Sequence, residues 1–352
     1  MSRFLHAKYQ KMTPYVPGEQ PRDKAYVKLN TNESPYPPAP AVLEAIERTT
    51  VEDLRLYCDP ECKKLKTKLS QTYGVNDKNV FVCNGSDEAL NFAFMAFGEK
   101  GATYADITYG FYEVFADLHA VISDIIPLSD SFAIEVEKYY GKNNLVIIAN
   151  PNAPTGKALS LGEIESVVKN NPDGVVVVDE AYVDFGADSA VNLTAKYDNL
   201  LVVHTFSKSR SMAGARLGYA IGNEALISDL ELIKYSTNPY NVNSLTQLLG
   251  VKTLENAEYY SENCKKIAKT RDNLIAWLED KGFTVLPSKA NFIFAKTEKV
   301  SGEELYLRLK DEGVLVRYFK KERIKDFCRI TIGSKEQTEI LKQKIDLILS
   351  EK

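Results

Sequence analysis

Short apolar segments alternate with segments of helical spacing over residues 101–221, and this alternation constrains the fold more than any other feature of the sequence. Strands that alternate with helices predict a largely parallel sheet with helices on both faces. In such a sheet, ligands bind at the edge formed by the carboxyl ends of the strands. We expect strands at residues 104–108, 121–128, 145–149, 174–178, 200–204 and 217–221.

Length and composition favour a globular protein with two domains. The chain has 352 residues, of which 44% are apolar, enough to bury a sizeable core. Its net charge of -4 gives no electrostatic reason to bind nucleic acid or an anionic membrane. The apolar runs are too short to span a bilayer, and the N-terminus lacks the apolar core of a secretion signal. We therefore expect a cytoplasmic protein without nucleic-acid or membrane partners.

The cysteines and histidines do not form a metal-binding pattern. Only Cys58 and Cys62 of the five cysteines lie close together in the sequence. A zinc site would need further ligands near them, and the three histidines, His6, His119 and His204, are spread along the chain. We expect reduced thiols and no metal site.

The pattern changes at both ends of the alternating region. Residues 1–40 are rich in proline and tyrosine, which predicts an extended arm. After about residue 223 the sequence becomes more helical, with short strand-like runs at 290–294, 314–317 and 327–333. The sequence therefore predicts an arm over residues 1–40, a large domain over 41–245 and a small C-terminal domain over 246–352.

Lys208 follows the apolar run at 200–203 and lies among small hydroxyl residues. Thr205 and Ser207 precede it, and Arg216 comes eight positions later. A lysine in this position suits a Schiff base with an aldehyde cofactor, whose phosphate the hydroxyls and the guanidinium would bind. A surface loop after a core strand explains the same residues, so this stretch alone leaves both interpretations open.

Two other strand ends carry polar residues. Asp179 ends the most apolar strand, where a carboxylate needs a cation or a donor, such as a protonated pyridine nitrogen. A helix cap or a structural ion pair is the alternative. Gly85, Ser86 and Asp87 follow a strand-like run and open a helix, where backbone N–H groups favour an anion. A plain helix cap also explains these three residues.

Several motifs, taken in order, resemble the fold-type-I aminotransferases that use pyridoxal phosphate. They are GSDEAL, TYGFY, NPNAPTG, VVVDEAY, TFSKSRSMAGARLGY and CRITIG. The segments PYVPGE, LNTNESPYPP and PYNVNS are most similar to the histidinol-phosphate aminotransferase subgroup. The resemblance covers nearly the whole chain. It implies an α/β fold with a mostly parallel seven-stranded sheet between helices in a large domain, a smaller α/β C-terminal domain and an extended N-terminal arm.

The resemblance also implies roles for single residues toward the cofactor. Lys208 would form the Schiff base and move the proton at the substrate α carbon, Asp179 would pair with the ring nitrogen, and Tyr182 would bond the phenolic oxygen. These three are the predicted catalytic residues. Tyr109 would stack on the ring. The predicted phosphate ligands are the turn of Gly85, Ser86 and Asp87, with Thr205, Ser207 and Arg216.

Two further cofactor contacts follow from the resemblance. Many relatives have asparagine directly before PTG, where this chain has Ala153, so we assign the bond to the phenolic oxygen to Asn152. Tyr57 matches a tyrosine that reaches the phosphate from the neighbouring subunit, which implies a homodimer with shared sites.

The implied substrate site combines two arginines with the arm. Arg329 matches the arginine that binds the substrate carboxylate or phosphate, and Arg317 would be a second phosphate ligand. Tyr15, Asn32 and Glu33 would meet an imidazole. One site would then accept both substrates in turn, in a ping-pong scheme. The implied reaction, in histidine biosynthesis, interconverts L-histidinol phosphate and 2-oxoglutarate with imidazole-acetol phosphate and L-glutamate.

Other specificities and a different class of protein stay open. Related sequences act on aromatic amino acids or decarboxylate threonine phosphate, and both alternatives use the same fold. A pyridoxal-fold binding protein without catalysis is disfavoured, because the lysine, the aspartate, the arginine and both tyrosines are present.

Overall fold

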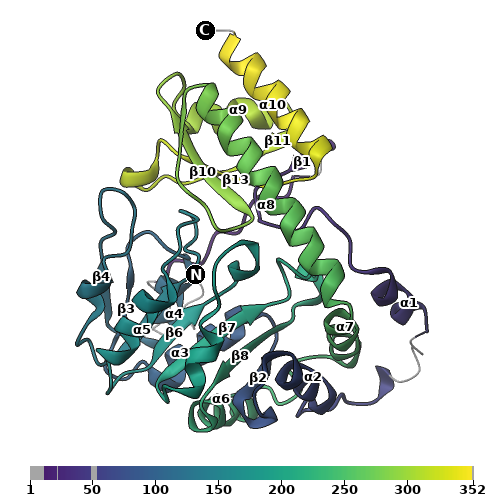
Figure 1. Cartoon of the computed structure of the whole chain (residues 1–352), viewed down its shortest axis with the longest axis vertical. Coiled ribbons are helices and arrows are strands. Elements are labelled where there is room, and N and C mark those ends of the chain that lie inside the picture. The colour runs from purple at the N-terminus through teal and green to yellow at the C-terminus, as the bar shows by residue number, and fades with distance from the viewer. Residues whose placement is uncertain (1–11, 22, 49–53, 351–352) are drawn as a thin grey trace, which may run out of the picture.

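The computed structural model describes residues 12–21, 23–48 and 54–350. His6 and the first eleven residues of the predicted arm lie outside the described residues. A seven-stranded sheet forms the centre of the larger part of the molecule (Figure 1). Its spatial order is β2 (Val80–Cys83), β8 (Gly218–Gly222), β7 (Leu200–Thr205), β6 (Val176–Asp179), β5 (Leu145–Ala149), β3 (Ala102–Ala105) and β4 (Ser123–Ile126).

Neighbouring strands of this sheet are parallel except at β8, which runs antiparallel to β2 and β7. The predicted mostly parallel seven-stranded sheet is therefore confirmed. Every residue of β5, β6 and β7 is buried. These strands read as continuous apolar runs because helices cover both faces of the sheet.

Two sets of helices form the two cores beside the sheet. On one face pack α3 (Ser86–Phe97), α4 (Phe111–His119) and α6 (Glu224–Thr237). On the other face pack α1 (Pro40–Arg48), α2 (Lys63–Tyr73), α5 (Leu161–Lys169) and α7 (Ser244–Glu255). Each helix buries one apolar stripe, such as Ile164, Val167 and Val168 on α5, where the spacing predicted a helix.

The smaller part contains a second sheet with four antiparallel strands. Its order is β12 (Arg317–Tyr318), β13 (Cys328–Thr331), β10 (Phe292–Thr297) and β9 (Phe283–Val285). The helices α8 (Ala257–Asp280), α9 (Gly302–Asp311) and α10 (Lys335–Ser350) share its core. This arrangement confirms a smaller α/β part at the C-terminus.

The arm and α8 connect the two parts. In the arm, β1 (Val27–Lys28) pairs in parallel with β11 (Val314–Leu315) of the smaller part. The 24-residue α8 runs from the larger part to the smaller one (Figure 1). The boundary predicted after residue 245 falls inside α7, whose residues share a core with α1 and α2. The division into three segments stays a prediction.

Within the described ranges, no helix is long and apolar enough to cross a bilayer. The same ranges contain no group of three or more His, Cys, Asp or Glu side chains suited to a metal ion. All five cysteines are described, and each is a free thiol.

Gly218 allows the first residue of β8 to lie against the turn that opens α3. It pairs with Cys83 of β2, two residues before Gly85. A Cβ atom on Gly218 would lie 2.4 Å from the backbone nitrogen of Ser86 and 2.6 Å from the carbonyl carbon of Gly85. The close approach of these two backbones therefore requires glycine at this position.

We predict that Gly218→Ala lowers the free energy of unfolding of the cofactor-free protein by about 1–3 kcal/mol, because the added methyl group has no room beside a backbone. Gly214→Ala is the matched control: a Cβ there meets nothing within 4 Å. That variant should change the stability by less than about 1 kcal/mol. Urea unfolding measures both, and equal stabilities would contradict the packing argument.

Candidate active site

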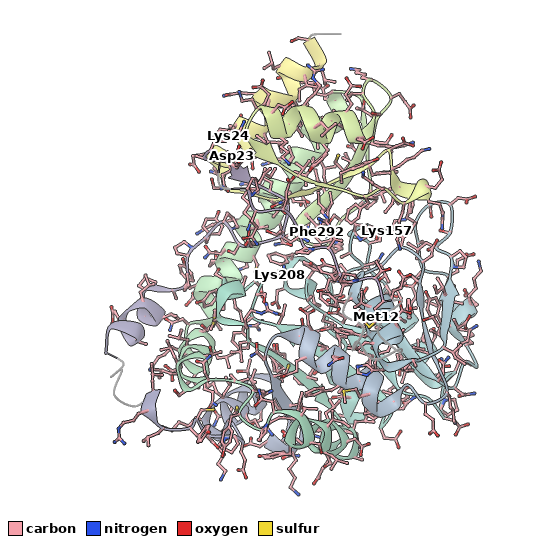
Figure 2. All side chains as sticks on the ribbon, turned by 180° about the vertical axis from the view of Figure 1, so that it is seen from behind. Met12, Asp23, Lys24, Lys157, Lys208 and Phe292 are labelled. Carbon is pink, nitrogen blue, oxygen red and sulfur yellow. The ribbon has the colours of Figure 1, made fainter. Side chains whose placement is uncertain are left out.

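A cavity of about 660 Å³ lies at the carboxyl ends of the large-sheet strands. The strand ends, the arm and the smaller sheet all contribute to its wall. In Figure 2, Lys208 lies near the middle of the molecule, close to the level of Phe292 on the smaller sheet. The predicted site residues that line it are Tyr15, Asn32, Glu33, Ser86, Asp87, Tyr109, Asp179, Tyr182, Thr205, Ser207, Lys208, Arg216, Arg317 and Arg329.

Lys208 lies in the loop after β7, with its amine inside this cavity. The amine donates a hydrogen bond to the carbonyl oxygen of Thr31 in the arm at 3.1 Å. It also lies 5.8 Å from the centre of the Tyr182 ring. Burial, together with the charge of Arg329, lowers the pKa of Lys208 to about 8. A neutral amine, which is the nucleophilic form, is therefore available near neutral pH.

Asp179 ends β6 and is only 5% exposed. The hydroxyl of Tyr112 donates to its Oδ2 at 2.8 Å, and the backbone N–H of Ala181 donates to its Oδ1 at 3.2 Å. Burial raises the pKa of Asp179 to about 6, although both donors oppose this shift. A buried carboxylate that faces a cavity is suited to bind a cationic group there.

Tyr112 is not among the site residues predicted from the sequence. It comes three positions after Tyr109, and the chain turns between them, since the backbone N–H of Tyr112 donates to the carbonyl oxygen of Tyr109 at 3.2 Å. That spacing was the available signal, but it does not reveal which buried group the hydroxyl meets.

Tyr182 is oriented by a chain of hydrogen bonds that begins in the smaller sheet. Thr331 of β13 accepts the backbone N–H of Asn32 at 3.0 Å and donates to its Oδ1 at 2.9 Å. The Asn32 side-chain amide then donates to the Tyr182 hydroxyl at 3.1 Å. Both polar ends of the Asn32 side chain are thus bonded to protein groups. This arrangement supports a role for Asn32 toward Tyr182 rather than toward an imidazole.

The other predicted imidazole contacts also have protein partners. Glu33 pairs with Lys28 at 2.7 Å and accepts a hydrogen bond from the Thr31 hydroxyl at 2.7 Å. Tyr15 stacks on Phe111 of α4, with the ring centres 4.2 Å apart. The arm is therefore held against both parts of the molecule beside the cavity.

The turn before α3 forms a cradle for an anion. Gly85 has a φ of 77°, and Ser86 and Asp87 occupy the first turn of the helix, where backbone N–H groups have no acceptor within the helix. Arg216 lies close to this turn, with its Nη2 3.4 Å from Oδ2 of Asp87. A Cβ on Gly85 would come within 2.5 Å of the same Nη2, so a larger residue would displace the guanidinium.

Arg317 and Arg329 face the cavity from the smaller sheet, where the two residues pair directly across β12 and β13. Arg317 donates to the carbonyl oxygens of Val16 and Pro17 at 2.9 and 3.2 Å. Arg329 donates to the carbonyl oxygen of Asn30 at 3.0 Å. Its buried Nε has no hydrogen-bond partner among the described residues. Two adjacent guanidiniums bonded to neutral carbonyls provide a site for a doubly charged anion.

Asn152 does not line the cavity with the other predicted residues, and its contact with a cofactor stays a prediction. Its side-chain nitrogen donates to the carbonyl oxygen of Ile107 at 2.9 Å and to the Thr155 hydroxyl at 3.1 Å. Its Oδ1 accepts the Thr108 hydroxyl at 2.8 Å. The side chain is buried, and its amide bonds both its own loop and the segment after β3. This geometry gives no support to a bond with a cofactor.

Tyr57 also lies outside the residues that line the cavity of its own chain. The side chain is 83% exposed and stacks on Tyr240 with ring centres 4.4 Å apart. An exposed tyrosine held by a ring contact is available to a second molecule. This placement is compatible with the predicted contact to a neighbouring subunit.

Comparison with known proteins identifies the family. A family model described as aminotransferase class I and II matches residues 24–345. The chain belongs to this family. It is 49% identical to histidinol-phosphate aminotransferase of Brachyspira hyodysenteriae, with 99% of each chain covered. It is also 49% identical to the enzyme of that name from Marinomonas sp., over 96% of this chain and 97% of that one.

The fold is also that of a solved structure. The model superimposes on histidinol-phosphate aminotransferase from Sinorhizobium meliloti in complex with pyridoxal-5'-phosphate, with a TM-score of 0.85 and 23% identity. The alignment covers 93% of this chain and 92% of that one. At this identity the comparison shows the shared fold.

The residues around the cavity fit pyridoxal phosphate in this aminotransferase. The cradle at Gly85 and Arg216 suits its phosphate, and a Cβ at Gly85 would occupy part of that cradle. Asp179 offers a buried anion for the pyridinium nitrogen, and Lys208 offers an amine for the aldehyde. When bound, the cofactor supplies an electron sink for carbanion chemistry.

We predict that Lys208 of the cofactor-free protein titrates with a midpoint near pH 8, because burial and Arg329 disfavour its cationic form. Competitive acetic anhydride labelling from pH 6 to 11, read by mass spectrometry, measures this midpoint. Exposed lysines such as Lys64 give the internal comparison. Arg329→Gln should raise the Lys208 midpoint, whereas a midpoint near 10 in the unmodified protein would refute the assigned environment.

Proposed function

We propose that this pyridoxal-phosphate-dependent aminotransferase acts on L-histidinol phosphate and 2-oxoglutarate, forming imidazole-acetol phosphate and L-glutamate in histidine biosynthesis. The observation that carries the proposal is the pair of guanidiniums of Arg317 and Arg329, which line the same cavity as Lys208. A dianionic phosphate matches such a pair in charge and geometry. The 49% identity to two histidinol-phosphate aminotransferases over nearly their full length supports the same substrate.

The residues of the site divide the work of the reaction. Lys208, when neutral, takes the proton from the substrate α carbon and returns it during the transfer. Asp179 would offer its carboxylate to the ring nitrogen of the cofactor, and Tyr182 would offer its hydroxyl to the phenolic oxygen. Tyr109 covers the ring, with its own hydroxyl bonded to Asp87 at 2.8 Å. The turn of Ser86 and Asp87, with Thr205, Ser207 and Arg216, binds the cofactor phosphate.

The arginine pair and Lys208 determine the position of the substrate in the cavity. Arg317 and Arg329 bind the phosphate of histidinol phosphate, which holds the reacting amine toward Lys208. The carboxylate of glutamate uses Arg329 in the second half-reaction, so the two substrates occupy the site in turn. Tyr15, from the arm, remains the proposed contact for the imidazole, since its ring lies at the cavity wall.

The same proposal includes a homodimer located in the cytoplasm. Tyr57 is exposed together with Leu54 and Leu56, and Tyr240 stacks on it, which forms an apolar surface that a second copy could cover. Tyr57 would then reach the cofactor phosphate of the neighbouring chain.

The absorption spectrum of the cofactor-loaded protein tests the reaction. We expect the yellow absorption to be lost on addition of L-histidinol phosphate and restored by 2-oxoglutarate. Lys208→Ala should lose turnover by several orders of magnitude. Loss of colour with phenylalanine alone would move the substrate to the aromatic amino acids. Release of carbon dioxide from threonine phosphate would indicate the decarboxylase instead.

Variants of the arginine pair make the same experiment specific for phosphate. Arg317→Gln and Arg329→Gln should each raise the half-saturating concentration of histidinol phosphate about 10- to 100-fold, while that of unphosphorylated histidinol stays within about threefold. Arg323→Gln is the control, because that guanidinium pairs with Asp106 at 2.7 Å. Equal losses for both substrates would contradict phosphate recognition by the pair.

Mixing two inactive variants tests the shared site. Chains with Tyr57→Ala and chains with Lys208→Ala should each be impaired at limiting cofactor. If Tyr57 serves the neighbouring site, an equal mixture that exchanges chains at random recovers about a quarter of the normal activity, since about half of the dimers are hybrids and one of the two sites in each hybrid is intact. A mixture of Lys208→Ala and Asp179→Asn chains is the control and should recover none. No recovery in the first mixture would exclude the contribution of Tyr57 across subunits.

A further inference from the structure

Tyr112 contacts Asp179, and the proposed mechanism assigns no role to this contact. Its side chain is fully buried on α4, and its hydroxyl donates to Oδ2 of Asp179 at 2.8 Å. The other carboxylate oxygen accepts the N–H of Ala181 at 3.2 Å. Each oxygen of this buried carboxylate therefore has a donor within the protein, one from its own strand end and one from a helix on the face of the sheet.

The turn that leads into α4 holds Tyr112 in this position, since the backbone N–H of Tyr112 donates to the carbonyl oxygen of Tyr109 at 3.2 Å. Tyr109 and Tyr112 lie three residues apart, with ring centres separated by 5.7 Å and planes at 86°. Tyr104 also packs against Tyr112, with ring centres 6.0 Å apart and planes at 65°. One tyrosine of the turn thus lines the cavity, while the other is held beneath it by two edge contacts. A ring confined in this way keeps its hydroxyl aimed at one acceptor.

On the basis of the proposed function, we propose that Tyr112 is a positioning residue that keeps the Asp179 carboxylate ionised and turned toward the ring nitrogen of the cofactor. The hydroxyl remains a donor, since burial and the charge of Asp179 hold the pKa of Tyr112 well above its usual range. A donor in contact with a carboxylate favours the ionised form.

Charged and titratable groups on several elements act on Asp179. They are Tyr112 on α4, Asp87 at the start of α3, Lys208 in the loop after β7, and Glu180 and Tyr182 in the segment after β6. Burial raises the pKa of Asp179 to about 6, and the hydrogen bond from Tyr112 is the largest of the effects that lower this pKa. Without this bond the carboxylate becomes protonated at a higher pH. A neutral Asp179 cannot pair with a protonated ring nitrogen.

The test measures the affinity of the cofactor-free protein for pyridoxal phosphate from pH 5.5 to 9. Affinity should fall on the acid side as Asp179 is protonated. In Tyr112→Phe this fall should occur about one pH unit higher, since a hydrogen bond to a charged group is worth about one unit of pKa. Tyr104→Phe is the matched control: its hydroxyl bonds Ser123 at 2.7 Å, within the same aromatic cluster. That variant should keep the normal profile.

Two further measurements report on the protonation of Asp179 and on the donor strength of residue Tyr112. The carboxyl carbon-13 signal of Asp179 in the cofactor-free protein should titrate at a higher pH in Tyr112→Phe. Replacement of Tyr112 by 3-fluorotyrosine keeps the ring and strengthens the donor. It should move both the affinity profile and the carbon-13 titration of Asp179 to lower pH. This second variant provides the test if Tyr112→Phe does not fold.

Asp179→Asn separates this inference from the proposed function. If that variant binds pyridoxal phosphate with the normal affinity and pH profile, the assignment of Asp179 to the ring nitrogen fails. If Asp179→Asn loses affinity while the profiles of Tyr112→Phe and Tyr104→Phe coincide with that of the unmodified protein, the role of Tyr112 is overturned. The role of Tyr112 is supported if the pH profile of Tyr112→Phe moves to higher pH and that of the 3-fluorotyrosine protein moves to lower pH, while that of Tyr104→Phe does not move.

Discussion

The structure depends on the burial of polar side chains at the end of apolar strands. Strands β6 and β7 are buried on both faces, so any polar group at their carboxyl ends leaves water as the chain folds. Asp179 and Lys208 are the clearest cases. Each meets donors or acceptors supplied by distant segments, Tyr112 for the carboxylate and the arm carbonyl of Thr31 for the amine. The altered proton affinities of both groups are a direct result of this burial.

The same burial of polar groups explains why the large sheet, the smaller sheet and the arm all contribute to the cavity. The large sheet provides the acid, the amine and the anion cradle, but it provides no counterpart for a second anion. Arg317 and Arg329 come from a sheet more than 60 residues later in the chain, and β13 also carries Thr331, which orients Asn32. One short strand therefore supports two contacts of different kinds, one toward a substrate and one toward the wall around the cofactor.

Much of the fold could be predicted from the sequence because periodicity reports burial directly. The runs at 174–178 and 200–204 differ from β6 and β7 by one or two residues, and their polar ends do meet at one sheet edge. The position of β8 between β2 and β7 could not be predicted, since pairing partners are set by contacts far apart in the sequence. The direction of the Asn152 side chain could not be predicted for a similar reason. Adjacency to a motif does not fix side-chain direction in a loop, and three neighbours use its amide.

The arm has a thermodynamic consequence for ligand affinity. In the described part of the arm, the backbone is held by the pairing of β1 with β11, and the carbonyls of Val16 and Pro17 accept hydrogen bonds from Arg317. Ordering a segment of this length in the free protein transfers that loss of conformational entropy from the binding step to the folding step. A small substrate with few atoms then binds to a preorganised wall. Its limited interaction energy is not offset by the entropy cost of ordering a loop around it.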